Sequence, residues 1–312
     1  MGAFRFSDDN KRYHTLYYHN KHTYGCRIYK APVDAGFTCP NIDGSRGRGG
    51  CIFCDGGSGY FTADSALSVS EQLDREAERI RRKDPDAKIL AYFQAHSNTY
   101  ATAERLREVF EEAVRWGACG ISAATRADCL DEEKVRLLAG LPVPVTVELG
   151  LQTVNNSVAA KMNRCHSFEE FLEGYRLLKE YGLRVCVHII DGLPGEEASD
   201  MLETARVLGA LRPDGIKIHL LHVIKGTALH KMYVRGEYTP LSREEYIDIV
   251  VRQLEVIPAE TVIERITGDG DKSKLAAPLW SADKIAVLGG IDKRQRELDT
   301  WQGKLFSEGQ YA

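Results

Sequence analysis

The sequence contains no apolar run that approaches the roughly 20 residues needed to cross a membrane as a helix. Its first residues, MGAFRFSDDNKRYH, carry charges where a secretory signal peptide has an apolar stretch. We therefore expect a cytoplasmic protein without a membrane partner. Neither sign of charge dominates, because 41 basic and 45 acidic residues leave a net charge of −4. That balance is unlike a protein that coats nucleic acid nonspecifically.

The sequence also lacks a disulfide framework. Eight cysteines scattered over 312 residues do not resemble the dense cysteine pattern of a small secreted domain, so reduced thiols are expected. A hydrophobic content of 43% is enough for a large core. The chain length fits either two domains of ~150 residues or one α/β barrel with an appendage.

Three of the cysteines are grouped in the glycine-rich segment GFTCPNIDGSRGRGGCIFCDGG, as Cys39, Cys51 and Cys54. Thiolates are soft ligands that suit iron–sulfur clusters or zinc, and the flexible loop between Cys39 and Cys51 allows all three to reach one centre. A structural zinc or an ordinary four-iron cluster is bound by four protein ligands. Three cysteines therefore indicate a centre with one open coordination position for a substrate or cofactor. Two alternatives stay open: three unrelated buried thiols, and a zinc site completed by Cys26 or a nearby histidine.

Strand-like and helix-like segments alternate along most of the chain. Each of six predicted strands is followed by helix, a pattern that indicates a parallel sheet curled into a barrel or partial barrel. The predicted strands span residues 27–36, 88–95, 120–126, 144–153, 184–195 and 215–226. A helix near 242–256, a strand from 260 and a helix near 281–299 follow as a C-terminal α/β extension.

Polar residues gather at the predicted strand ends, where the active face of such a barrel lies. After the cysteine loop come Gln94, Thr125, Arg126, Asp128, Glu148, Gln152, His188, His219, His222 and Lys225. A zinc knot would not require polar groups at every other strand end. The pattern therefore favours a catalytic cluster.

Several motifs together resemble the radical S-adenosylmethionine (radical SAM) enzymes, and within them a small bacterial family related to the catalytic subunit of Elongator, which modifies the wobble uridine of tRNA. The motifs are the cysteine loop, Thr-Arg-x-Asp at 125–128, ELGLQT at 148–153, the pair Arg164 and His166, and GLPGE at 192–196. The resemblance implies an α/β fold with a partial (β/α)6 parallel barrel. It divides the chain into an N-terminal extension (1–26), the barrel (27–235) and a substrate-side extension (236–312).

The resemblance also implies roles for single residues. Cys39, Cys51 and Cys54 would bind three irons of a [4Fe–4S] cluster, with S-adenosylmethionine on the fourth. Arg164 would pair with the methionine carboxylate of that cofactor, because its planar fork binds carboxylates bidentately. The remaining implied cofactor contacts are Phe53 near the adenine, Gln94 near the methionine amino group, Gln152 near the ribose, Glu148 on the cofactor or on Arg164, His188 on a hydroxyl, and Gly192 and Pro194 in a turn beside the adenine.

The implied reaction is reductive cleavage of S-adenosylmethionine to a 5′-deoxyadenosyl radical, with an electron donor such as flavodoxin or ferredoxin. The implied substrate is the C5 side chain of a tRNA wobble uridine, with trimming of carboxymethylaminomethyl to aminomethyl as one such change. We expect neither acetyl-coenzyme A chemistry nor a second cluster. The alternatives are a radical SAM enzyme for a small metabolite and a non-catalytic nucleic-acid-binding protein with a cluster or zinc.

The N-terminal stretch is a candidate surface for tRNA. Residues 1–50 hold eight Lys or Arg against four Asp, and the segment YHTLYYHNKHTY interleaves aromatic and basic side chains. Such a surface can stack bases and contact phosphates. The alternative is an N-terminal extension packed against the barrel.

Overall fold

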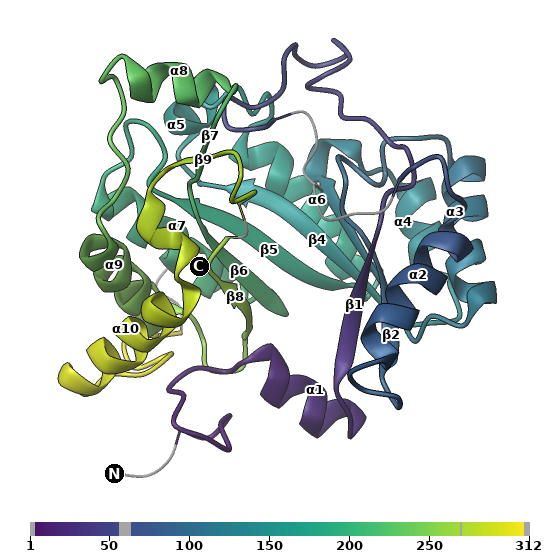
Figure 1. Ribbon diagram of the computed structural model, residues 1–312, viewed down its shortest axis with the longest axis horizontal. Helices are drawn as coiled ribbons and strands as arrows, with labels where there is room; N and C mark the ends of the chain where they lie inside the picture. The colour runs from purple at the N-terminus through teal and green to yellow at the C-terminus, as the bar shows by residue number, and fades with distance from the viewer. Residues whose placement is uncertain (1–3, 56–63, 269, 309–312) are drawn as a thin grey trace.

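The computed structural model describes residues 4–55, 64–268 and 270–308. Seven parallel strands form one sheet in the order β1-β2-β3-β4-β5-β6-β8. They are β1 (Ile28–Val33), β2 (Lys88–Phe93), β3 (Ile121–Arg126), β4 (Val145–Gln152), β5 (Arg184–Asp191), β6 (Gly215–Leu220) and β8 (Val262–Ile266). The sheet curls into a half-barrel with helices outside it (Figure 1), which confirms the predicted α/β fold.

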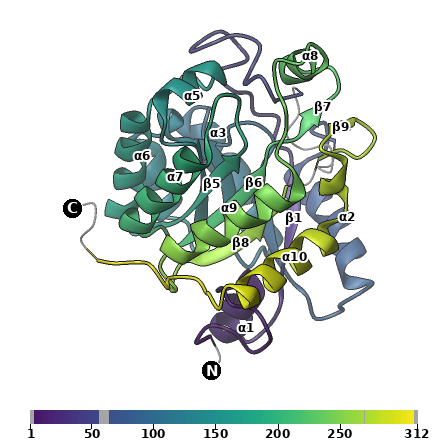
Figure 2. The same ribbon diagram turned by 90° about the vertical axis from the view of Figure 1, so that its left-hand side faces the viewer.

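Most helices connect successive strands and cover the outer face of the sheet (Figure 2), whereas α8 (Ala228–Val234) lies beside β7 (Val223–Ile224) at one end and α10 (Lys284–Glu297) follows the last strand. The connecting helices are α2 (Val69–Arg81), α3 (Ala103–Trp116), α4 (Glu132–Ala139), α5 (Asn156–Lys161), α6 (Phe168–Glu180), α7 (Ala198–Leu211) and α9 (Arg243–Val256). Several begin at capping boxes, in which a serine and a glutamate three residues on satisfy free backbone N–H groups. These boxes are Ser68 with Glu71, Ser167 with Glu170 and Ser242 with Glu245.

The central strands are buried on both faces, as parallel strands covered by helices usually are. In β3 and β6, for example, only one residue in each strand is not fully buried. The core between sheet and helices includes Phe93, Phe110 and Phe171, each with essentially no exposed surface. This packed layer fixes the strand ends on which the site is built.

The two edge strands of the half-barrel meet through side chains. Lys30 on β1 donates to Glu264 on β8 at 2.9 Å, and Arg184 on β5 donates to the same carboxylate at 2.7 Å. Because β8 belongs to the predicted C-terminal extension, that extension shares the sheet with the barrel. Ion pairs therefore connect the two edges of the half-barrel, although β8 and β1 are not neighbours in the sheet.

The structure differs from the predicted elements in two places. The segment predicted as one strand over 215–226 is divided into β6 and the short β7 (Val223–Ile224), which pairs antiparallel with β9 (Leu275–Ala277). The N-terminal stretch contains a helix, α1 (Leu16–Tyr24), that the sequence reasoning did not anticipate. None of the helices within the described ranges combines the length and apolar content of a membrane span.

Candidate active site

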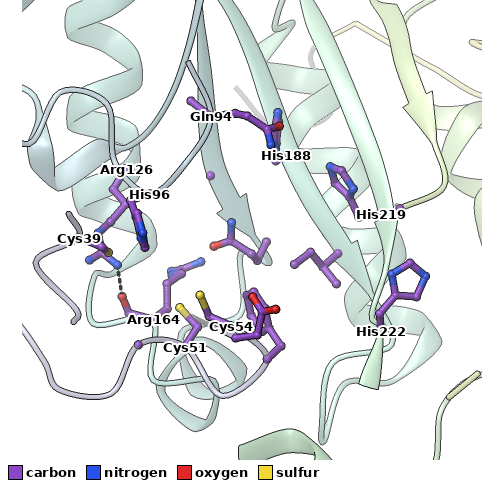
Figure 3. Close-up of a pocket in the computed structure, with 18 of the residues that line it drawn as sticks. Cys39, Cys51, Cys54, Gln94, His96, Arg126, Arg164, His188, His219 and His222 are labelled. Atoms are coloured by element: carbon purple, nitrogen blue, oxygen red, sulfur yellow. Dashed lines mark hydrogen bonds between the residues drawn. The ribbon is translucent and has the colours of Figure 1, made fainter. Parts of the chain in front are cut away.

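A cavity of about 400 Å³ opens at the carboxyl-terminal edge of the sheet (Figure 3). Most of the predicted site residues line it, although they come from four different strands or the connections that follow them. The predicted residues at its wall are Cys39, Cys51, Phe53, Cys54, Gln94, Glu148, Gln152, Arg164 and His188. The chain therefore brings together side chains that lie more than 140 residues apart in the sequence.

The cysteine loop is held by backbone hydrogen bonds and by its neighbours. The N–H of Ile42 donates to Cys39 O at 2.8 Å, and the N–H of Cys54 donates to Cys51 O at 2.9 Å. Gly50 adopts a left-handed φ of 74°, which glycine reaches without steric cost. At Gly47 a Cβ atom would overlap Asn41 Oδ1 and lie 2.7 Å from Cys165 Sγ, so this position needs glycine.

The three thiols share the wall of the cavity. Figure 3 shows Cys51 and Cys54 pointing into it near Arg164, with Cys39 on the side of Arg126. Within the described ranges no three His, Cys, Asp or Glu side chains gather as ligands of a single metal ion. A four-iron cluster does not need such a gathering, because each of its thiolates binds a different iron. Burial raises the pKa of Cys51 to about 11, so binding of iron there would release a proton.

Arg164 is almost fully buried and points an unused donor at the same cavity. Its Nε donates to His166 O at 3.0 Å, and its Nη1 donates to the carbonyl oxygens of Thr153, at 2.7 Å, and Leu151. Its Nη2 has no hydrogen-bond partner anywhere in the described part of the chain. Burial lowers the pKa of Arg164 to about 10. A buried guanidinium with a free donor beside three thiols fits a ligand that carries a carboxylate.

Arg126 is a second cation at this wall, and the sequence reasoning assigned it no contact. It binds both carboxylate oxygens of Asp128, at 2.9 and 2.7 Å, and its Nη1 donates to Arg164 O at 2.8 Å (Figure 3). Arg126 therefore fixes the backbone from which Arg164 projects. The motif Thr-Arg-x-Asp could have indicated the pair of Arg126 and Asp128. Only the structure shows that Arg126 also contacts the backbone of Arg164.

Glu148 lies in the barrel interior, and its carboxylate accepts hydrogen bonds from five side chains. Its Oε1 accepts from Lys30 at 2.6 Å and from Ser122 at 2.7 Å. Its Oε2 accepts from Tyr92 at 2.8 Å, from His188 at 2.8 Å and from Lys217. Burial alone would raise the pKa of this carboxyl, but the attraction of Lys217 and Lys30 outweighs burial and holds the pKa well below its usual range.

That network corrects one of the expected roles of Glu148. Glu148 makes no hydrogen bond to Arg164, whose donors go to backbone oxygens or stay free among the described residues. Instead it orients His188, whose ring lies 5.2 Å from that of His219. Burial lowers the pKa values of His188, His219 and His222, so neutral imidazoles line this end of the cavity near pH 7. His219 Nε2 is buried and has no hydrogen-bond partner in the described ranges.

Gln152 sits at a backbone irregularity that directs it to the cavity. The pairing of β4 with β5 shifts register between Gly150 and Gln152, and Gln152 has a left-handed φ of 64°. A Cβ atom on Gly150 would lie 2.8 Å from Gln152 Nε2, so glycine there makes room for the glutamine side chain. Gln94, just beyond the end of β2, and Phe53, between two of the cysteines, also reach the wall.

Gly192 and Pro194 are not among the described residues that line the cavity. The N–H of Gly192 donates to Met201 Sδ at 3.3 Å, and its carbonyl accepts from Tyr238 at 2.8 Å. Its φ is 84°, and a Cβ would approach Leu241 to 3.1 Å. These contacts explain the glycine as part of a turn between β5 and α7, and a place beside the adenine stays a prediction.

Within the N-terminal stretch, the segment 4–24 lies away from the cavity, at the opposite end of the strands (Figures 1 and 2). Its backbone pairs with the start of β8, where the N–H of Ile263 donates to His14 O at 2.8 Å. Its cations are in ion pairs: Arg5 with Glu260, Lys11 with Asp292, Arg12 with Asp299 and Lys21 with Asp8. The structure thus supports the packed-extension alternative over the expected tRNA surface.

Comparison with known sequences identifies the class of protein to which this site belongs. The model of the radical SAM superfamily matches residues 42–208, and that of the Radical_SAM C-terminal domain matches residues 213–297. The chain belongs to the radical SAM superfamily. Its cofactors are therefore a [4Fe–4S] cluster and S-adenosylmethionine, and the three thiols and the free donor of Arg164 fit both groups.

Individual relatives place the chain more narrowly. It is 44% identical to the protein YtqA of Bacillus subtilis over 307 residues, which cover 97% of this chain and 95% of YtqA. It is 34% identical over 151 residues to the tRNA uridine(34) acetyltransferase of Methanocaldococcus jannaschii, covering 46% of this chain and 27% of that enzyme. The structure of Methanocaldococcus infernus Elp3 shares the fold, with a TM-score of 0.69 and 20% identity over 88% of this chain and 64% of that one. The chain is thus a radical SAM enzyme related to Elp3.

Proposed function

We propose that this enzyme modifies the C5 side chain of the wobble uridine in tRNA, with trimming of carboxymethylaminomethyl to aminomethyl as the specific change. The main observation in support of this chemistry is that Cys39, Cys51 and Cys54 line the same cavity as Arg164, whose Nη2 has no partner among the described residues. When bound and reduced, the cluster and S-adenosylmethionine would supply a 5′-deoxyadenosyl radical that takes a hydrogen atom from the methylene carbon of the carboxymethyl group. Loss of one further electron to the oxidised cluster, loss of a proton and addition of water would break the C–N bond, release the group as glyoxylate and leave the aminomethyl amine. A flavodoxin or ferredoxin is the proposed electron donor.

The protein's own residues bind and orient the reactants. We assign Cys39, Cys51 and Cys54 to the irons and Arg164 to the methionine carboxylate. Phe53, Gln94 and Gln152 face the same cavity and are assigned to the rest of S-adenosylmethionine, for which amide and aromatic side chains are suited.

The opposite wall of the cavity is the proposed substrate side. His188, fixed by Glu148, and His219, whose Nε2 is free among the described residues, present neutral ring nitrogens there. A neutral imidazole can donate to or accept from a polar substrate group. The extension 236–312 begins before α9, and its strand β8 brings Arg265 to the same wall.

The choice of tRNA as substrate is supported by the relative that is named a tRNA uridine(34) acetyltransferase. The match to that enzyme covers 46% of this chain and 27% of the relative. A shared barrel does not by itself fix the substrate.

The test uses tRNA from a strain that lacks the gene. This tRNA is incubated under anaerobic conditions with S-adenosylmethionine, a reductant and either the parent protein or its Cys54→Ala variant, and its nucleosides are analysed by mass spectrometry. We expect the parent to lower the mass of the wobble nucleoside by the loss of a carboxymethyl group, and the variant to leave it unchanged. Unchanged nucleosides in a reaction that still yields 5′-deoxyadenosine would refute tRNA as the substrate.

A further inference from the structure

The mouth of the cavity is framed by segments that are distant in sequence. The N–H of Leu229, in α8, donates to Ile52 O in the cysteine loop at 2.8 Å, and the N–H of Lys225 donates to Lys274 O at 2.8 Å. On the other side, Asn163 Nδ2, just after α5, donates to Gly50 O at 2.8 Å. Both views place α5, α8 and β7 at one end of the molecule and α1 at the other (Figures 1 and 2).

This frame carries exposed cations that make no ion pair with any residue in the described ranges. We call them the rim cations: Arg48, Lys161, Lys225, Lys231 and Lys272. They contrast with the four Lys and Arg residues of the segment 4–24, which all have carboxylate partners. The acidic residues Asp55 and Asp271 near these cations already bind neighbouring side chains. Asp271 accepts from Ser273 at 2.6 Å, and Asp55 pairs with Lys274 at 3.3 Å.

The segment from β7 through α8 combines positive charge with exposed aromatic surface. Between residues 223 and 236 the chain has no acidic residue, and its Lys225 and Lys231 are unpaired among the described residues, whereas Arg235 pairs with Glu237 at 2.7 Å. On α8, Tyr233 is 37% exposed and Val234 is 69% exposed. Cations that contact phosphates, together with an aromatic ring on which a base can stack, are the features with which proteins hold single-stranded nucleic acid.

We propose that the rim cations and Tyr233 form the surface on which the RNA substrate docks, with its phosphates on the cations and the target nucleotide directed into the cavity. The inference rests on the proposed function, because it takes a tRNA loop as the substrate. The net charge of −4 does not by itself oppose docking, since charges more than about 8 Å from the rim are screened at physiological salt. A loop with unstacked bases is the form of RNA that proteins read most readily.

The test compares two triple variants of the full-length protein. The rim variant carries Lys225→Gln, Lys231→Gln and Lys272→Gln. The matched control, from the N-terminal stretch, carries Lys11→Gln, Arg12→Gln and Lys21→Gln. Binding of unmodified wobble-uridine tRNA is measured over a range of salt concentrations. The rim variant should reduce the slope of log K against log salt by about 2 to 3, since each lost phosphate contact removes about 0.7 to 0.9.

The control variant should keep the slope of the parent protein. Tyr233→Leu should weaken binding about 5- to 100-fold without changing the slope, because stacking releases no counterions. Formation of 5′-deoxyadenosine without tRNA should be unchanged in every variant, which shows that the fold and the cluster are intact. If the slope of log K against log salt in the rim variant equals that of the parent protein, the proposed docking surface is wrong, but the proposed function is not affected. No salt-dependent tRNA binding by the parent, while S-adenosylmethionine is still cleaved, would overturn both.

Discussion

Replacing Glu148 by Gln removes the charge that holds five donors at the centre of the barrel. Lys217 is 4% exposed, and its only carboxylate partner among the described residues is Glu148. Removing one partner of a buried ion pair leaves an uncompensated buried charge and typically costs about 3 to 5 kcal/mol. We therefore expect Glu148→Gln to lower the free energy of unfolding by about that amount.

The assay is urea denaturation at pH 7.5, followed by circular dichroism under anaerobic conditions. The matched control is Glu78→Gln, which breaks an exposed pair with Arg82 and should change the free energy of unfolding by less than about 1 kcal/mol. The double variant Glu148→Gln with Lys217→Met removes the orphaned cation and should recover part of the loss. Equal stabilities for Glu148→Gln and Glu78→Gln would refute the reasoning.

The same network predicts a pH dependence. Because the pKa of Glu148 in the folded protein is held well below its usual value, the ionised carboxylate contributes stability above the ordinary pKa of about 4.3. That contribution is lost as the pH falls from about 4.3 towards the folded-state pKa. Denaturation at pH 7, 4 and 3 should therefore show a difference between parent and Glu148→Gln that is fully present at pH 7 and narrows below about pH 4.3. A constant difference would contradict this assignment.

Two further changes test the cavity wall. Arg164→Ala should weaken S-adenosylmethionine binding, measured by calorimetry on the reconstituted protein, by about 1.5 to 3 kcal/mol, the scale of hydrogen bonds to charged groups. The exposed Arg136→Ala should have no effect, and equal affinities for the two variants would show that Arg164 does not face the cofactor. Gly47→Ala should lower iron incorporation, because its Cβ would overlap Asn41 Oδ1, whereas Gly289→Ala, which has open space, should retain iron. Full iron in Gly47→Ala would contradict the packing argument.

Much of the barrel was predictable because its strands are short apolar runs with helices between them. The predicted strand over 120–126 and the helix over 101–116 agree with β3 and α3 to within two residues. The break between β6 and β7 was not predictable, because IKIHLLHVI is apolar apart from one lysine and two histidines and carries no turn signal. Only the pairing of β7 with β9, about 50 residues later, explains it.

The site was predictable where local sequence fixes it and unpredictable where distant residues meet. Spacing alone singled out Cys39, Cys51 and Cys54, because one loop carries them. The partners of Glu148 were hidden, since Lys30 and Lys217 lie 118 and 69 residues away. The positive charge of the N-terminal stretch predicted an RNA surface there, but Lys11 and Arg12 form ion pairs with acidic residues near the other end of the chain. A count of charges along the sequence does not reveal such long-range pairs.

The central claim is that the cysteine loop holds a cluster that acts on S-adenosylmethionine. The most direct measurement is the yield of 5′-deoxyadenosine per protein from reduced, anaerobically reconstituted parent and Cys51→Ala proteins, with iron and sulfide determined on the same samples. The account predicts about four irons and formation of 5′-deoxyadenosine in the parent, and loss of both in the variant. Stoichiometric zinc without iron in the freshly purified parent, or undiminished 5′-deoxyadenosine from Cys51→Ala, would contradict it.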